Sequence, residues 1–198
     1  SHAVALASPS EIRRLTEPDR FIVVLPHKIS VYSDKARTAI ITELYQGTRA
    51  ALAGKSAGGI HVLVPFRKPD GSLMSVEGWI APDADISVSW QPFTQANVIR
   101  TFFRLLGRPY GWHDSWHERD CCGAVRTVYR TFGIILPRGT TSQLHSSDHV
   151  ICFKKETPKD VKYKYLEACE PGITVCGFSG HIVLYLGKVN GSNFVLHS

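Results

Sequence analysis

The spacing of apolar residues changes near residue 93, and this change limits what the chain can fold into. Before it, short apolar runs alternate with Gly, Pro and Asp turn signals, a pattern typical of a small all-β barrel or sandwich. The expected strands are Phe21–Leu25, Ile29–Tyr32, Ala39–Tyr45, Ala50–Leu52, Ile60–Phe66 and Leu73–Ile80. The sequence predicts an all-β domain with its linker over residues 20–92, the linker being Pro82–Pro92, and a second domain over 93–198. Residues 1–19 are expected to form an irregular lead-in segment with a short helix around Ile12–Leu15.

The second domain is expected to contain two amphipathic helices. Thr94 is expected to cap the first, which runs to Leu106. The apolar residues of the second follow a helical spacing at Ala124, Val125, Val128, Tyr129 and Phe132. Asp120 is a favourable N-cap, which places Cys121 in the first turn. The helix dipole there favours the thiolate, the nucleophilic form of cysteine. Cys121 is thus a candidate nucleophile, and a buried structural thiol is the alternative.

Composition narrows the function classes. The 198 residues carry a net charge of +6, which suits an anionic partner such as a wall polymer, or simply solubility. Lysines and arginines are scattered and interrupted by acidic residues, so no nucleic-acid stripe is expected. With no run of about eighteen apolar residues, no transmembrane segment is expected either.

The cysteines and histidines also permit a metal site. The five cysteines include no C-x-x-C pair, and a disulfide among Cys152, Cys169 and Cys176 is left open. On one helix, His113, His117 and Cys121 would share a face and could bind zinc. Glycine and aspartate signals around them indicate a loop, and a fourth ligand is not evident, so we expect no metal.

A thiol nucleophile needs a base, and the base needs an orienting partner. The closing strands, His181–Leu186 and Asn193–His197, each carry a histidine. A two-residue Asn190-Gly191 turn would put the two histidines on opposite faces, whereas a five-residue loop over 187–191 would put them on one face. We expect the longer loop, and a bulge near Gly187 is the alternative that also restores the shared face.

The candidate cysteine and histidines belong to a set of motifs that resembles a known family, the NlpC/P60 cysteine peptidases. The motifs that carry the resemblance are Arg108-Pro109-Tyr110-Gly111-Trp112, Arg119-Asp120-Cys121-Cys122-Gly123, Val128-Tyr129, Gly133-Ile134, Leu136-Pro137-Arg138, Gln143, the run from Gly180 to Gly187, and Leu196-His197-Ser198. They cover residues 93–198 in order. The preceding region, ending in Glu77-Gly78-Trp79-Ile80, resembles a bacterial SH3-like (SH3b) domain.

The resemblance implies an α+β protein in which a small all-β SH3b-like barrel precedes a papain-like domain. It implies a secreted, periplasmic or cell-envelope hydrolase that cleaves peptidoglycan stem peptides at the γ-D-glutamyl-L-diamino acid (diaminopimelate) bond without a cofactor. Muropeptide recycling in the cytoplasm is the other location considered.

The same resemblance assigns roles to residues. Cys121 is the nucleophile, His181 the base and His197 the orienting residue, and Tyr110 lines the nucleophile's site. The substrate-binding candidates are Asp120, Cys122, Thr140, Trp112 and Arg138. Asp120 would bind the free amine of an N-terminal L-Ala, and Thr140 would contact D-Glu.

Three departures from the family pattern stand out. Cys122 replaces the usual Ser and donates a weaker hydrogen bond. His113-Asp114 replace two glycines, which adds bulk near the site. The chain stops one residue after His197 and lacks a common N-terminal segment, so a fragment or one half of a processed protein is expected. An acyltransferase or amidase of the same fold, and a non-catalytic wall-binding module, are the alternative functions.

Overall fold

The computed structural model describes residues 18–198, which divide into two compact units at Gln91/Pro92. The lead-in helix expected around Ile12–Leu15 lies outside the described residues. Within those residues, no helix is both long and apolar enough to cross a bilayer.

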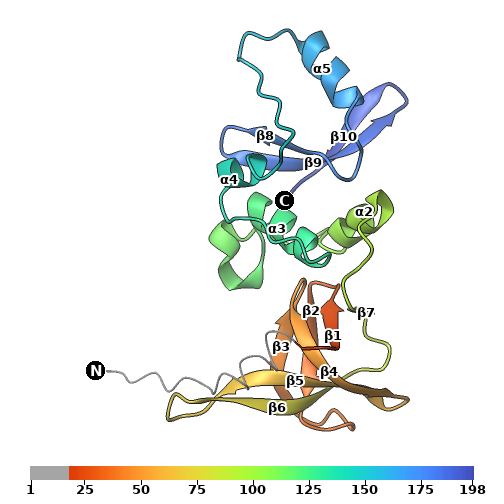
Figure 1. Ribbon diagram of the computed structural model, residues 1–198, viewed down its shortest axis with the longest axis vertical. Helices are drawn as coiled ribbons and strands as arrows, with labels where there is room; N and C mark the ends of the chain where they lie inside the picture. Colours follow the sequence, from red (N-terminus) through yellow and green to blue (C-terminus); the bar gives the residue numbers. More distant parts are fainter. Residues whose placement is uncertain (1–17) are drawn as a thin grey trace. The chain divides into compact units, whose positions relative to one another are not determined.

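The first unit is a 7-stranded antiparallel sheet with the order β3-β2-β6-β5-β4-β1-β7 (Figure 1). Its strands are β1 (Phe21–Val24), β2 (Lys28–Tyr32), β3 (Ile40–Tyr45), β4 (Arg49–Ser56), β5 (Gly59–Arg67), β6 (Leu73–Ile80) and β7 (Ile86–Val88). The core is aliphatic and includes Ile22, Val31, Val62 and Ile80, all buried. Alternating inward-facing side chains on paired strands supply this core, as expected for antiparallel sheets.

Six of the seven strands match the strands predicted from the sequence. The seventh, β7, lies where a linker was expected. The segment Pro82–Pro92, expected to be a linker, contains β7, which pairs with β1 through Ile22↔Val88 and Val24↔Ile86. Three residues are too few to show an alternating pattern, so the sequence did not reveal this strand. β4 also extends to Ser56, beyond the Leu52 end that was expected.

The second unit combines helices with a three-stranded antiparallel sheet of order β10-β9-β8. Its elements are α2 (Gln95–Phe103), η1 (Trp112–His117), α3 (Cys121–Arg130), α4 (Thr140–Leu144), α5 (Lys159–Glu167), β8 (Val175–Phe178), β9 (His181–Val189) and β10 (Ser192–Leu196). α3 packs against β9 and α2, so it lies at the centre of the unit (Figure 1). Its buried side chains join those of Val98, Phe102, Ile182 and Leu184 in one core.

Local signals placed the two central helices correctly. Thr94 caps α2 by accepting a hydrogen bond from the Asn97 N–H at 3.2 Å, although the helix ends at Phe103 and not at Leu106. Asp120 caps α3 by accepting from the Gly123 N–H at 2.7 Å. These bonds satisfy backbone donors that a helix start otherwise leaves without partners.

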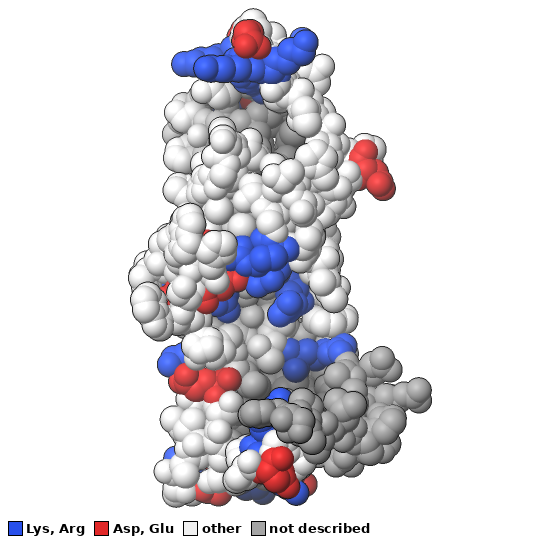
Figure 2. Space-filling view, turned by 90° about the vertical axis from the view of Figure 1, so that its left-hand side faces the viewer, with Lys and Arg blue, Asp and Glu red and all other residues white. Residues whose placement is uncertain are grey.

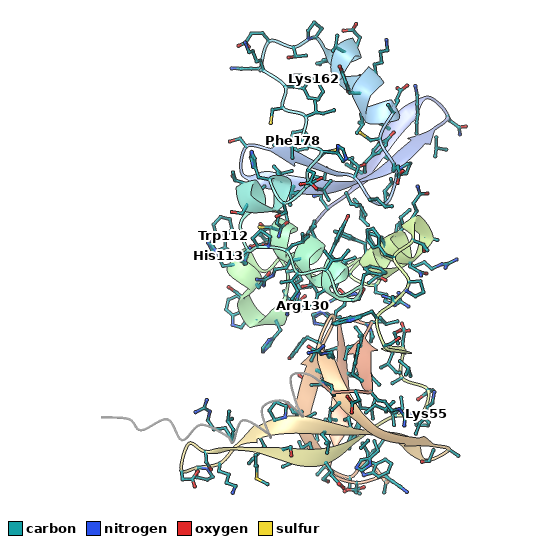
Figure 3. The ribbon with its side chains drawn as sticks, viewed as in Figure 1. Lys55, Trp112, His113, Arg130, Lys162 and Phe178 are labelled. Atoms are coloured by element: carbon teal, nitrogen blue, oxygen red, sulfur yellow. The ribbon has the colours of Figure 1, made fainter. Side chains whose placement is uncertain are left out.

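The region 139–170 contains α4 and α5, although its apolar residues show no helical periodicity in the sequence. No residue of α5 is buried, so the helix lacks the apolar stripe by which helices are recognised. Figure 2 shows Lys and Arg side chains gathered over the end of the unit that carries α5, where Lys162 is labelled in Figure 3.

Two glycines of the first sheet give a matched test of its packing. A Cβ on the buried Gly78 would overlap Val31 Cγ1 and approach Ile41 Cδ1 at 3.2 Å, whereas a Cβ on Gly54 would meet nothing within 4 Å. We expect Gly78→Ala to lower the free energy of unfolding by about 1–3 kcal/mol because it overpacks the core. Gly54→Ala, the control, should raise it by about 0.5 kcal/mol because alanine has less backbone entropy to lose. Urea unfolding measures both, and an unaffected Gly78→Ala protein would contradict this packing.

Candidate active site

Cys121 is the first residue of α3, and its side chain is 5% exposed. Asp120 before it has extended backbone, and its carbonyl accepts the Ala124 N–H at 2.8 Å. The helix therefore starts immediately at the thiol. Backbone N–H groups of the first turn and the positive end of the dipole favour negative charge there.

Tyr110 lies beside this helix start. It forms an isolated bridge with Arg119, one residue before the cap. Tyr110 is 49% exposed, and its phenol lies close enough to Cys121 to interact with it. Partial burial raises the pKa of Tyr110, and the nearby charges of Cys121 and Asp120 add to the rise. The phenol therefore stays protonated and can donate a hydrogen bond next to the thiol.

The two histidines of the closing hairpin face one another. The ring centroids of His181 and His197 are 5.0 Å apart, and the ring planes are nearly perpendicular at 85°. His181 opens β9, the strand against which α3 packs. Ser198, which follows His197, donates from its hydroxyl to the Arg119 carbonyl at 2.9 Å. That bond ties the end of the chain to the segment leading into Cys121.

A bulge, and not a long loop, brings these rings together. The expected five-residue loop over 187–191 is wrong, because Ser192 pairs with Val189 across a tight turn. Asn190 (φ 48°) and Gly191 (φ 81°) have the positive φ values that such a turn requires. The register then shifts between Phe194, opposite Gly187, and Val195, opposite Tyr185.

The extra residue in β9 at this bulge is Leu186. It reverses the faces on which the following residues point, so the alternative expected near Gly187 is the one found. With Leu196 opposite Leu184, His197 falls diagonal to His181 on the same face of the sheet.

Four of the predicted substrate-binding residues form one contact set around Cys122. Arg138 donates from Nη1 to Cys122 Sγ at 3.1 Å and from Nη2 to Asp120 Oδ2. Thr140 Oγ1 lies 3.5 Å from the same sulfur. Cys122 is therefore held as a buried acceptor between an arginine and a threonine.

The sequence assigned no role to Gln143 beyond its place in a motif. In the structure, the Gln143 side chain connects two backbone segments of this contact set. Its Nε2 donates to the carbonyls of Cys122 and Pro137, both at 2.9 Å. The residue is 4% exposed. Gln143 thereby couples the first turn of α3 to the Pro137-Arg138 segment. The one sequence signal for this role is that Gln143 belongs to the motifs that resemble the NlpC/P60 family.

The Asp120 carboxylate is more strongly engaged than the sequence indicated. Burial alone would raise its pKa, but hydrogen bonds from Arg138 and the Gly123 N–H outweigh burial and hold the pKa below the ordinary value. Oδ1 caps the helix and Oδ2 pairs with Arg138. The carboxylate is thus ionised at neutral pH.

Trp112 lies apart from this set. Its side chain is 70% exposed at the start of η1 and contacts His113 at a centroid distance of 5.1 Å. In Figure 3 both residues lie on the η1 segment, on the opposite side of α3 from α2. The structure therefore brings Asp120, Cys122, Arg138 and Thr140 together and leaves Trp112 on the surface.

The zinc alternative fails because His113, His117 and Cys121 do not share a helix. η1 is broken by positive φ values at His113 (54°), Asp114 (59°) and Trp116 (51°), and it ends before α3 begins. Over residues 18–198, no group of three or more His, Cys, Asp or Glu side chains is placed to hold a metal ion.

The comparisons with known proteins find relatives by structure alone. No family model and no curated protein matches the chain. A solved structure described as a novel NlpC/P60 endopeptidase from Photobacterium damselae subsp. piscicida superposes with a TM-score of 0.69 at 18% identity. The match covers 96% of this chain and 42% of that one.

An NlpC/P60 family protein from Bacillus cereus ATCC 10987 superposes with a TM-score of 0.55 at 19% identity, covering 90% of this chain and 58% of that one. The chain spans about half the length of these solved structures. At these identities the likeness establishes the fold: the mixed α/β chain is folded like NlpC/P60 proteins.

Proposed function

We propose that the chain is a cell-wall cysteine endopeptidase that cleaves peptidoglycan stem peptides at the γ-D-glutamyl-L-diamino acid bond. The observation that carries this proposal is the His181–His197 ring pair, on the sheet against which the Cys121 helix packs. The fold shared with NlpC/P60 endopeptidases supports the same reaction class.

In this mechanism each residue has one task. His181 takes the Cys121 proton, and the thiolate attacks the γ-carbonyl carbon of D-Glu. The N–H groups at the start of α3 stabilise the oxyanion. His181 as imidazolium then protonates the leaving amine of the diamino acid, leaving a thioester that water hydrolyses. His197 orients the His181 ring, and Tyr110 donates a hydrogen bond beside the thiol.

The first unit is proposed to be an SH3b-like domain that holds the enzyme on the wall. Its short antiparallel strands and aliphatic core support this assignment. We propose a cell-envelope location, where intact peptidoglycan lies, and muropeptide recycling in the cytoplasm is the alternative location. An acyltransferase or amidase reaction at the same thiol is the alternative chemistry, and a non-catalytic wall-binding module is the alternative function.

The nucleophile is tested with two cysteine variants. Cys121→Ala should lower kcat on L-Ala-γ-D-Glu-diaminopimelate by at least about a thousandfold, because it removes the attacking atom. Cys152→Ala is the matched control, since Cys152 is exposed and outside the contact set, and it should cleave as the wild type does. Mass spectrometry of the products identifies the bond cut. Equal cleavage by wild type and Cys121→Ala would refute the mechanism.

The amine-binding role proposed for Asp120 is tested on the substrate side. Each carboxylate oxygen accepts two hydrogen bonds, so Asp120 retains acceptor capacity beside Gly123 and Arg138. Acetylating the N-terminal L-Ala should lower kcat/KM by about tenfold or more through loss of a charge-assisted bond. In Asp120→Asn the free and acetylated substrates should be cleaved at similar rates. If wild type cleaves both equally, Asp120 is a helix cap and ion-pair partner only.

A further inference from the structure

Asp114 is a charged residue at the candidate site to which sequence reasoning assigned no role. Its Oδ2 accepts from Arg126 Nη2 at 2.9 Å and lies 3.5 Å from Arg138 Nε. Its Oδ1 is 3.4 Å from the Asp120 backbone N, which donates to it. The carboxylate therefore contacts Arg138 and the backbone of Asp120, the residue before the candidate nucleophile.

The local backbone is shaped to place this carboxylate. Asp114 has φ 59°, a left-handed conformation that aspartate tolerates better than most side chains. A Cβ at Gly123 would overlap Asp114 Oδ1, so any other residue at 123 would displace the carboxylate from its present position. Asp114 is 17% exposed at its side chain. The Asp114 carboxylate is thus largely enclosed by the protein and does not lie on the open surface.

Arg138 is the shared partner, and each of the three nitrogens of its guanidinium group has a contact. Nε faces Asp114, Nη2 pairs with Asp120, and Nη1 donates to Cys122 Sγ. The two aspartates, Arg126 and Arg138 together make a cluster of two negative and two positive charges. The cluster therefore offers a ligand no net positive charge.

The neighbouring arginines are also engaged. Arg108 forms an ion pair with Glu118. Arg119 donates to Thr127 Oγ1 at 2.9 Å and to the His117 carbonyl at 2.5 Å. Both guanidinium groups therefore already have partners within the chain.

This arrangement has a consequence for the substrate. A D-Glu joined through its γ-carboxyl keeps its α-carboxyl group, as a carboxylate or as the primary amide of D-isoglutamine. Carboxylates are commonly received by a two-pronged arginine. Here Arg138 is already paired with Asp114 and Asp120, and a substrate carboxylate received by Arg138 would lie beside these two aspartates, where like charges repel.

We propose that Asp114 is a positioning residue that sets substrate specificity: by holding Arg138, it makes the site prefer stem peptides whose D-Glu α-carboxyl is amidated. The inference rests on the proposed function and names the substrate class of the same site. Asp114 acts through Arg138 and takes no part in bond cleavage.

The experiment compares two peptides that differ only in the α-group, L-Ala-γ-D-Glu-diaminopimelate and its D-isoglutamine counterpart. Wild type should cleave the amide with kcat/KM about tenfold higher, the size expected for one charge-assisted contact. Asp114→Asn and Asp114→Gly should lower this ratio to unity or below because Arg138 becomes available. Glycine suits φ 59°, so the second variant keeps the fold if the first does not.

Glu167→Gln is the matched control. It removes one carboxylate from the exposed Lys188–Glu167 ion pair of the same unit, and the ratio should stay at the wild-type value. A wild-type ratio of one or less, or an unchanged ratio in both Asp114 variants, would overturn the inference. Absence of cleavage of either peptide would instead overturn the proposed function, and calorimetric binding of the two peptides to wild type would still measure the preference.

Discussion

The hydrogen bond from the Gly123 N–H to Asp120 is the interaction on which the candidate site depends. It fixes where α3 begins, and so it places Cys121 in the first turn and Cys122 against Arg138. The same carboxylate joins the helix start to Arg138 through its second oxygen. One side chain therefore links the backbone geometry of the helix to the charges around the thiols, which explains why it is buried and yet ionised.

In the β9–β10 hairpin, a turn and a bulge together determine where the two histidines lie. A tight Asn190-Gly191 turn is the locally preferred connection, but alone it would separate the two histidines. One extra residue, Leu186, corrects the register after the turn has formed. Turn stability and ring placement are thus set by different residues of the same strand pair.

Features encoded by neighbouring residues could be predicted from the sequence, and features encoded across the chain could not. Both helix caps, the start of α3 and six strands of the first sheet followed from caps, turns and periodicity. The five-residue loop expected over 187–191 is wrong because Asn190-Gly191 forms the tight turn that its local sequence favours. The contacts of Asp114 with Arg126 and Arg138 join residues 12 and 24 positions apart, and no local pattern reveals them. α5 was not predicted because none of its residues is fully buried, so its sequence shows no clear apolar stripe.

The overlap between Asp114 and any side chain at position 123 has a consequence for how such a site can change. The two positions are coupled, because a side chain at 123 would overlap Asp114 Oδ1 and would have to move the carboxylate away from Arg126 and Arg138. A substitution at Gly123 would therefore also change the charge environment of Arg138, because Asp114 is an ion-pair partner of that arginine. The effect of a change at one of these positions thus depends on which residue stands at the other.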